Sequence, residues 1–160
     1  MGKTSANARF LLGDAGHFLA FGLGAGLTPK APGTAGTLLA FPLYWAVIDW
    51  SPSARWLLAV VLFAVGVWLC GRACRALGKH DDSGVVLDEI VAFYAVLLAL
   101  PAGALWQAAG FALFRVLDSY KPPPLRWLDN NVGGGFGIML DDAVAALFTV
   151  FLLALAAAVI

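Results

Sequence analysis

Acidic residues gather at a few places along the chain, in a pattern that suits metal chemistry. Eight of the ten lie in the stretches 80–89 and 115–142: Asp81, Asp82, Asp88, Glu89, Asp118, Asp129, Asp141 and Asp142. Two carboxylates about 4 Å apart repel one another by about 4 kcal/mol at an effective dielectric near 20. Hard oxygen ligands without a Cys or His cluster suit Mg²⁺, which binds through carboxylates, waters and a substrate phosphate. The pattern therefore predicts a Mg²⁺ site that also takes a phosphate group.

Basic and hydroxyl residues near these acids could hold the phosphate. Arg115, Asp118 and Lys121 are spaced i, i+3, i+6, so the first two share a helix face and the third extends from its end. The Pro-Gly-Thr-Ala-Gly-Thr segment, residues 32–37, leads into a helix and could offer backbone N–H groups and hydroxyls. The predicted phosphate-binding residues are Lys30, Gly33, Thr34, Thr37, Arg115 and Lys121.

The sequence excludes several other chemistries. It contains no Gly-x-x-x-x-Gly-Lys-Ser/Thr segment, so a P-loop nucleotide site is not expected. Neither Cys70 nor Cys74 is followed by the Arg of a cysteine phosphatase, because residues 76 and 80 are Ala and His. With two isolated histidines, a histidine nucleophile is poorly supported, and a net charge of zero indicates no nucleic-acid partner. Metal-assisted attack remains, with a carboxylate as base or nucleophile.

Each group also has a purely structural interpretation. The acidic pairs at 88–89 and 141–142 open predicted helices, where carboxylates offset the helix macrodipole. Arg115 and Asp118 suit a plain i,i+3 ion pair, and the glycines at 133–135 suit a flexible turn. Each of these interpretations explains one group only. A shared metal and phosphate site explains why the acidic groups converge on one face, and we favour it.

The elements that must position these residues are apolar helices. The 160-residue chain is 61% hydrophobic and 12% charged, with a mean hydropathy of +0.85, whereas soluble domains carry roughly a quarter charged residues. Four runs, 31–48, 56–71, 90–114 and 143–160, contain no Asp, Glu, Lys, Arg or His. Such runs are membrane spans or deeply buried helices. We predict one all-α, polytopic membrane domain over residues 1–160, with helices at 36–50, 55–77, 85–100, 104–119 and 137–160.

The run 90–114 is long enough to cross once, but Pro101-Ala102-Gly103 near its middle favours a helical hairpin. With five crossings, one side receives nine basic residues, Lys3, Arg9, Lys30, Arg72, Arg75, Lys79, Arg115, Lys121 and Arg126, and the other receives only Arg55. With a single crossing here, the division is six to four. The positive-inside rule therefore selects five crossings with a cytoplasmic N-terminus, after a glycine-laced interfacial segment at residues 18–27.

Four ordered motifs resemble those of a known family. They are Thr28-Pro29-Lys30-Ala31-Pro32-Gly33-Thr34-Ala35-Gly36-Thr37, then Asp88-Glu89, then Phe114-Arg115-x-x-Asp118-x-x-Lys121-Pro122, then Asp129-x-Asn131-x-Gly133-Gly134-Gly135-Phe136-Gly137-Ile138-Met139-x-Asp141-Asp142. In this order and spacing, the chain resembles the phosphatidylglycerophosphatase A family over about residues 17–146. It departs from the family pattern around residues 80–84, so Asp81 is a stronger candidate than Asp82.

The resemblance implies a bacterial inner-membrane, Mg²⁺-dependent enzyme. It would hydrolyse phosphatidylglycerophosphate to phosphatidylglycerol and inorganic phosphate, in the synthesis of phosphatidylglycerol and of cardiolipin downstream. The hypothesis assigns catalysis and metal binding to Asp88, Glu89, Asp118, Asp141 and Asp142, and further metal contacts to Asp81 and Asp129. Asn131 joins the predicted phosphate-binding residues.

Two other functions stay open at this level. A small cation channel or transporter would spread its acids through the bilayer depth, and a non-catalytic membrane subunit would show no phosphatase activity. The acids gather at one predicted face, which favours the enzyme. The sequence leaves open which carboxylate is the base or nucleophile, how many metals bind and whether a phospho-enzyme forms. It also leaves open the oligomeric state, the lipid selectivity and the roles of His80 and Asp82.

Overall fold

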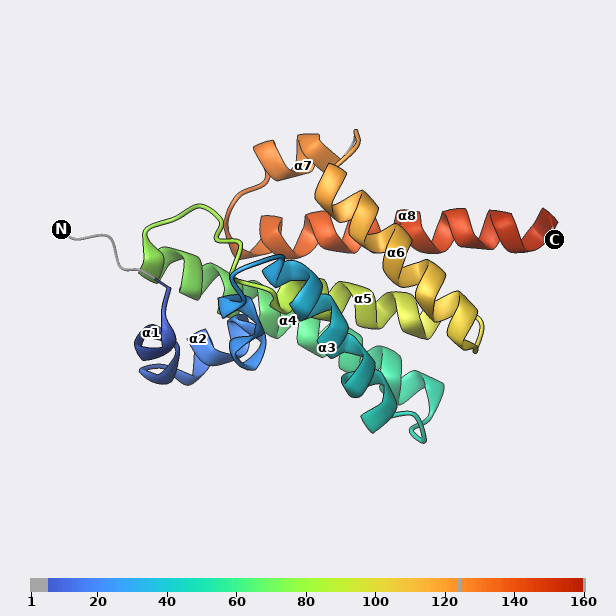
Figure 1. Ribbon diagram of the computed structural model, residues 1–160, viewed down its shortest axis with the longest axis horizontal. Helices are drawn as coiled ribbons and strands as arrows, with labels where there is room; N and C mark the ends of the chain where they lie inside the picture. Colours follow the sequence, from blue (N-terminus) through green and yellow to red (C-terminus); the bar gives the residue numbers. More distant parts are fainter. Residues whose placement is uncertain (1–5, 124, 160) are drawn as a thin grey trace.

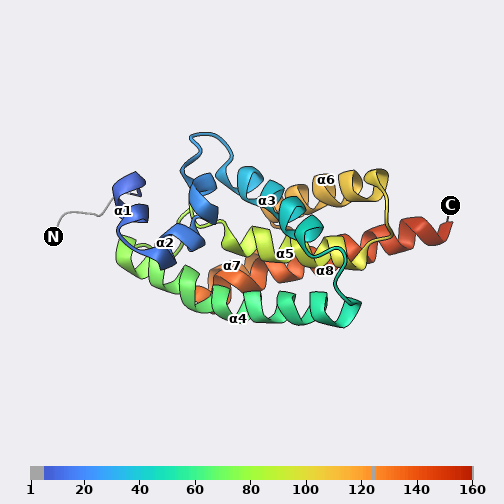
Figure 2. The same ribbon diagram turned by 90° about the horizontal axis from the view of Figure 1, so that it is seen from below.

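The computed structural model describes residues 6–123 and 125–159, and every regular element in these ranges is a helix. In chain order the elements are α1 (Ala8–Leu12), α2 (Ala15–Ala20), the 3₁₀-helix η1 (Gly22–Leu27), α3 (Pro32–Ala46), α4 (Pro52–Leu77), α5 (Leu87–Ala99), α6 (Ala104–Tyr120), α7 (Leu125–Asn131) and α8 (Gly134–Val159). The helices α4, α5 and α8 lie along the long axis of the molecule, and α1 and α2 lie at one end (Figures 1 and 2). The all-α prediction is confirmed.

Helix α5 lies at the centre of the bundle. It packs against α3, α4, α6 and α8, and its side chains Phe93, Tyr94 and Val96 are fully buried. A helix that is apolar on all sides belongs in an interior. Because α5 carries Asp88 and Glu89 in its first turn, its central position places both carboxylates among the surrounding helices.

The predicted hairpin is confirmed. Helix α5 ends at Ala99, and α6 begins at Ala104, beyond Pro101. Gly103 precedes α6 with a φ of 136°, a conformation that glycine adopts without a Cβ clash. Since the two helices run in opposite directions (Figure 1), Asp118 in the last turn of α6 returns to the end of the bundle where α5 starts.

Two helices, α4 and α8, are long and apolar enough to cross a membrane, each with a mean hydropathy of 2.2. Exposed apolar side chains on both, such as Leu57 and Leu147, suit contact with lipid. Helices α3, α5 and α6 have 15, 13 and 17 residues and are shorter than the about 20 residues that a span needs. The structure therefore shows two candidate spans, whereas the sequence predicts five.

Some helix ends differ from the predicted ones. The segment 32–37 is predicted to lead into a helix that starts at residue 36, but α3 already begins at Pro32, because proline is well accommodated in a helix's first turn. Helix α8 begins at Gly134 instead of residue 137, and its predicted last residue, Ile160, lies outside the described ranges. Helix α7 is not predicted, since seven residues are too few to show a helical period.

Glycines bring α4 and α8 together at the end of the bundle that carries the acidic residues. Gly66 faces the side chain of Met139, and Gly71 faces the backbone of Gly135. A Cβ on Gly135 would overlap the carbonyl group of Val67 on α4. Small residues at such crossings allow two helix backbones to approach closely. This approach fixes the N-terminal part of α8 and the carboxylates that it carries.

Candidate active site

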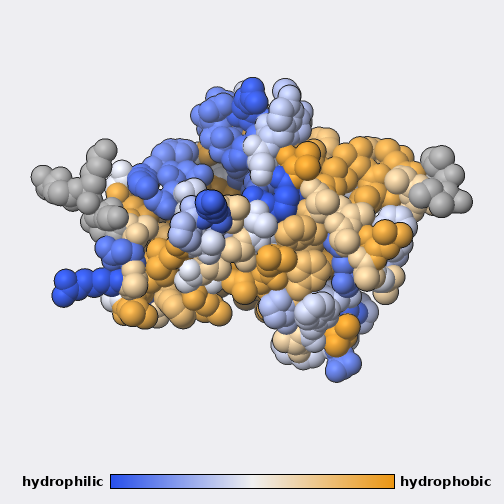
Figure 3. Space-filling model, viewed as in Figure 1, coloured by the Kyte–Doolittle hydropathy of each residue, from blue (hydrophilic) through white to orange (hydrophobic). Residues whose placement is uncertain are grey.

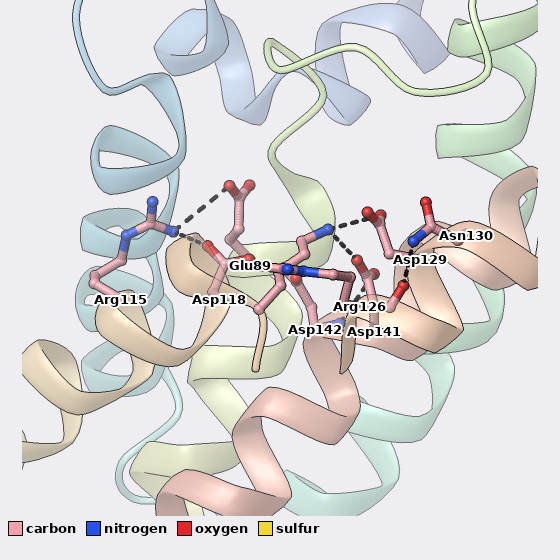
Figure 4. A network of polar contacts seen from close by, with 9 residues as sticks. Glu89, Arg115, Asp118, Arg126, Asp129, Asn130, Asp141 and Asp142 are labelled. Carbon is pink, nitrogen blue, oxygen red and sulfur yellow. Dashed lines mark hydrogen bonds and ion pairs between the residues drawn. The ribbon is translucent and has the colours of Figure 1, made fainter. Parts of the chain in front are cut away.

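Acidic side chains from five segments converge on one small cavity of about 80 Å³. The segments are the α4–α5 loop, the first turn of α5, the last turn of α6, α7 and the N-terminal part of α8. All seven predicted metal-site residues line it: Asp81, Asp88, Glu89, Asp118, Asp129, Asp141 and Asp142. Figure 4 shows several of these carboxylates facing one another. Residues up to 61 positions apart in the sequence thus form one site.

Three of these carboxylates form a cluster that could hold a cation. One oxygen each from Asp88, Glu89 and Asp142 lies within 4.8 Å of the others. Asp88 Oδ1, Glu89 Oε2 and Asp142 Oδ2 are buried and have no hydrogen-bond partner in the described part of the chain. Leaving buried polar atoms unpaired is costly, and clustered carboxylates also repel one another. This set of hard oxygen donors fits a divalent cation such as Mg²⁺.

Lys121 contributes a positive charge to the cavity wall. Its Nζ donates to Asp129 Oδ1 at 2.8 Å and to Asp141 Oδ2 at 2.5 Å. Lys121 directly follows the last residue of α6. Its φ of 44° is uncommon for residues other than glycine, and it turns the chain toward α7. Burial opposes the charge on Lys121, but the two hydrogen bonds outweigh it and raise its pKa. Lys121 is therefore protonated at neutral pH.

Arg115 forms a second ionic network beside the cavity (Figure 4). Its Nη1 donates to Asp118 Oδ2 at 2.6 Å and to Thr37 Oγ1 at 3.4 Å, and lies 3.6 Å from Glu89 Oε1. The i,i+3 ion pair of Arg115 and Asp118, the structural alternative that their spacing allows, is present. Gly33 on α3 leaves room for the Glu89 carboxylate, since a Cβ here would lie 2.1 Å from Glu89 Oε1 and displace it. The network holds Glu89 and Asp118 between α3, α5 and α6.

The α4–α5 loop contains two neighbouring acids with different surroundings. Asp82 is buried, accepts a hydrogen bond from the Gly84 N–H at 2.9 Å and pairs with Lys79, so its contacts shape the loop. Asp81 lies at the rim of the cavity, exposed on its outer side. Its partial removal from water raises its pKa, and the nearby Lys121 opposes that shift.

Of the seven predicted phosphate-binding residues, only Lys121 lines the cavity; the other six lie outside its lining: Lys30, Gly33, Thr34, Thr37, Arg115 and Asn131. Lys30 is exposed ahead of α3, Thr34 is partly exposed in the first turns of α3, and neither lines the cavity. The side-chain amide of Asn131 is exposed and donates to the Trp127 carbonyl at 2.7 Å, within α7. The directions of these side chains follow from where α3 and α7 begin, which the sequence pattern does not give. Their phosphate-binding roles stay predictions.

Three residues without a predicted role line the cavity: His80, Asp82 and Ser83. A single His or Ser shows no ligand spacing, so their nearness to Asp81 in the sequence was the one available signal. A Cβ on Gly133 would lie 3.1 Å from His80 Nε2, which places the histidine ring beside the turn that precedes α8.

The chain resembles known lipid phosphatases along most of its length. The family model of phosphatidylglycerophosphatase A matches residues 18–157. A phosphatidylglycerophosphatase A from Escherichia coli (strain K12) is 42% identical over 149 residues, covering 92% of this chain and 86% of the relative. One from Haemophilus influenzae is 40% identical over 136 residues, covering 84% and 83%. A protein from Bacteroides thetaiotaomicron, provisionally named a phosphatidylinositol-3-phosphatase, is 40% identical over 147 residues, covering 84% and 89%. No solved structure matches the chain.

Proposed function

Because the chain belongs to the phosphatidylglycerophosphatase A family and is a phosphoric monoester hydrolase, we propose that it hydrolyses phosphatidylglycerophosphate in its acidic cavity. The products are phosphatidylglycerol and inorganic phosphate. In the net reaction the ester P–O bond breaks, an oxygen from water bonds to phosphorus, and the departing alcohol takes a proton. The observation that carries the proposal is the convergence of eight acidic side chains, Asp82 included, and Lys121 on one cavity.

The size of the cavity supports a phosphoryl substrate. Its volume of about 80 Å³ is several times the roughly 10 to 15 Å³ that one water needs. A small polar group such as a phosphoryl group fits such a space. The lipid would therefore stay in the bilayer and insert its terminal phosphate.

Asp88, Glu89 and Asp142 would hold a Mg²⁺ ion. Their unpaired buried oxygens and mutual repulsion support this assignment. When bound, the cation would supply Lewis-acid stabilisation of the charge that develops on the phosphoryl oxygens. We infer one such cluster among the described residues.

The chain's own charged groups would complete the chemistry. The Lys121 ammonium group lies in the cavity wall and would bind a phosphoryl oxygen. Arg115 would act as a positioning residue, because its contacts are to Asp118, Glu89 and Thr37. A carboxylate of the cavity would accept the proton of the attacking water.

We further propose that the site faces the cytoplasm of a bacterial inner membrane. Helices α3, α4, α5, α6 and α8 would make five crossings, and the positive-inside rule supports this orientation. The three shorter helices would measure about 20 to 26 Å, less than the roughly 30 Å hydrocarbon core. Protein-covered helix ends or local thinning of the bilayer would accommodate the difference.

The cation-channel alternative is not favoured. It requires acidic residues along a path through the bundle. The described carboxylates of the site gather at one end, and the larger cavity between α4, α5 and α8 has an apolar lining. No specific observation supports ion conduction.

The test is phosphate release from phosphatidylglycerophosphate by the detergent-purified protein. We expect release with Mg²⁺, loss of release with EDTA, and recovery when Mg²⁺ is restored. Release that EDTA does not affect would contradict the metal assignment. No release under any condition would contradict the enzyme and favour the non-catalytic membrane subunit.

A further inference from the structure

A second cavity, with an apolar lining, lies between α4, α5 and α8. Its volume is about 360 Å³, and Ala, Val, Leu, Met, Phe and Trp side chains line it. Ala59, Val91 and Val96 are buried in its wall, whereas Val60 and Leu147 at its edge are 64% and 69% exposed. The cavity is therefore a groove that opens on the outer surface between the two long apolar helices.

The groove and the acidic cavity are built on the same two helices, α5 and α8. On α5, Asp88 lines the acidic cavity, and Val91, Ala95 and Ala99 line the groove. These positions are spaced i, i+3, i+7, i+11, so they share one face of the helix. One face of α5 therefore carries a carboxylate of the acidic cavity and, further along, the apolar residues of the groove.

Helix α8 shows the same arrangement. Asp142 lines the acidic cavity, while Met139, Ala146 and Val150, at i−3, i+4 and i+8, line the groove. At the acidic end Met139 packs against Gly66 of α4. Two of the three clustered carboxylates therefore stand on the same helix faces that form the walls of the groove.

The length of the groove matches one leaflet of a bilayer. On α5, eleven helical positions separate Asp88 of the acidic cavity from Ala99 at the far end of the groove, about 16 Å at 1.5 Å per residue. Half of the roughly 30 Å hydrocarbon core is about 15 Å. An apolar groove of this length, on the same helices as a site for a phosphoryl group, fits one acyl chain that extends from a head group at that site.

We propose that the groove binds one acyl chain of the lipid whose phosphate enters the acidic cavity. This inference rests on the proposed function and adds an acyl-chain subsite to it. Lipid tails are as apolar as the groove, so the chain gains little hydrophobic free energy by leaving the bilayer. Its contribution is orientation, because a fixed chain holds the phosphate within reach of the carboxylates.

The test places a bulky side chain at the end of the groove far from the acids. Ala99→Phe is compared with Ala154→Phe, a matched change at an exposed alanine of α8 outside the groove. The substrates are dihexanoyl and dioleoyl phosphatidylglycerophosphate in mixed micelles. We expect Ala99→Phe to lower kcat/KM for the dioleoyl lipid about tenfold or more. The value for the dihexanoyl lipid, and both values for Ala154→Phe, should stay near wild type.

Wild-type kcat/KM for the dioleoyl lipid in Ala99→Phe would overturn the acyl-chain subsite. No phosphate release from either lipid by the wild-type protein would contradict the proposed function instead.

A second measurement does not need catalysis. The protein is illuminated in vesicles that contain phosphatidylglycerol with a diazirine near one acyl terminus. Labelling of the partly buried groove residues Phe63 and Val150 should fall in Ala99→Phe, while labelling of the exposed Leu155 outside the groove stays constant. Equal labelling of Phe63 and Val150 in both proteins would overturn the subsite.

Discussion

At the scale of single residues, function and stability oppose one another in the cluster of Asp88, Glu89 and Asp142. At 4.8 Å, two carboxylates repel by about 3 kcal/mol at an effective dielectric near 20. Their buried oxygens also lack hydrogen-bond partners among the described residues. A cation removes both penalties, so we expect the metal-free protein to gain stability when one of the three charges is removed.

The change Asp88→Asn tests this expectation. In EDTA, the variant should unfold at a higher temperature than the wild type, because one repulsive charge is gone and the amide is nearly the same size. Added Mg²⁺ should raise the midpoint of the wild type and have little effect on the variant. Tryptophan fluorescence in detergent follows the unfolding.

Asp49→Asn, at an exposed acid between α3 and α4, is the control and should match the wild type in both conditions. A lower midpoint for Asp88→Asn in EDTA contradicts the repulsion argument.

The raised pKa of Asp81 predicts a pH dependence of stability. In the folded chain, the pKa of Asp81 lies above its ordinary value of 3.8, so the carboxyl group stays protonated to a higher pH. The resulting stabilisation is therefore present below pH 3.8 and is lost as the pH rises through the folded-state pKa. In EDTA, Asp81→Asn should raise the unfolding midpoint more at pH 7 than just below pH 3.8. An equal effect at both pH values would show that Asp81 titrates as in the unfolded chain.

The acids of the site were predictable because ionisable groups at the mouths of apolar helices are expensive and usually functional. The i,i+3 spacing also allowed the ion pair of Arg115 and Asp118. The directions of single side chains were not predictable. Asn131 bonds to its own helix, and Lys30 precedes a helix that starts four residues earlier than predicted. These outcomes depend on tertiary packing and local helix starts.

At the scale of elements, α3 supports the site through its glycines. A Cβ at Gly33 would collide with the Glu89 carboxylate, whereas a Cβ at Gly36 would press on Val86. Gly33→Ala should therefore displace Glu89 and lower kcat about 10- to 100-fold. Its unfolding midpoint should fall less than that of Gly36→Ala, whose clash lies in the apolar core. Steady-state kinetics and thermal unfolding of the two variants give the comparison. Wild-type kcat in Gly33→Ala would show that Glu89 tolerates the shift.

Hydrophobic runs and breakers predicted the principal helices well. The unbroken apolar run of α4 and the Pro-Ala-Gly break between α5 and α6 both appear in the structure. The number of membrane crossings was less predictable. A hairpin of 13- and 17-residue helices satisfies the hydropathy pattern, but neither helix alone has the length of a span.

At the scale of the whole molecule, the chain is divided between a polar end and apolar helices. Figure 3 shows hydrophilic surface gathered over α7 and its neighbouring loops, and hydrophobic surface along the C-terminal part of α8. The turns of the α3–α4 and α5–α6 connections lie at the other end of the bundle from α7 (Figure 1). This polarity suits an enzyme that meets a lipid phosphate at a membrane surface.

The proposed topology predicts which positions are accessible from each side. In a variant in which Ser replaces the buried Cys70 and Cys74, the single changes Asp49→Cys, Ala102→Cys and Asn130→Cys introduce exposed thiols. A membrane-impermeant thiol reagent should label the first two in spheroplasts and the third only after permeabilisation. Labelling of positions 49 and 102 from opposite sides would contradict the hairpin crossing.

The most direct test of the central claim, that the acidic cavity is the phosphatase active site, is the rate of phosphate release by Asp142→Asn. Purified wild type, Asp142→Asn and Asp49→Asn would be compared on phosphatidylglycerophosphate at saturating Mg²⁺. We predict that Asp142→Asn lowers kcat about 100-fold or more, while Asp49→Asn keeps wild-type turnover and all three unfold cooperatively. Wild-type kcat in a folded Asp142→Asn protein would contradict the claim and move the active site away from this cavity.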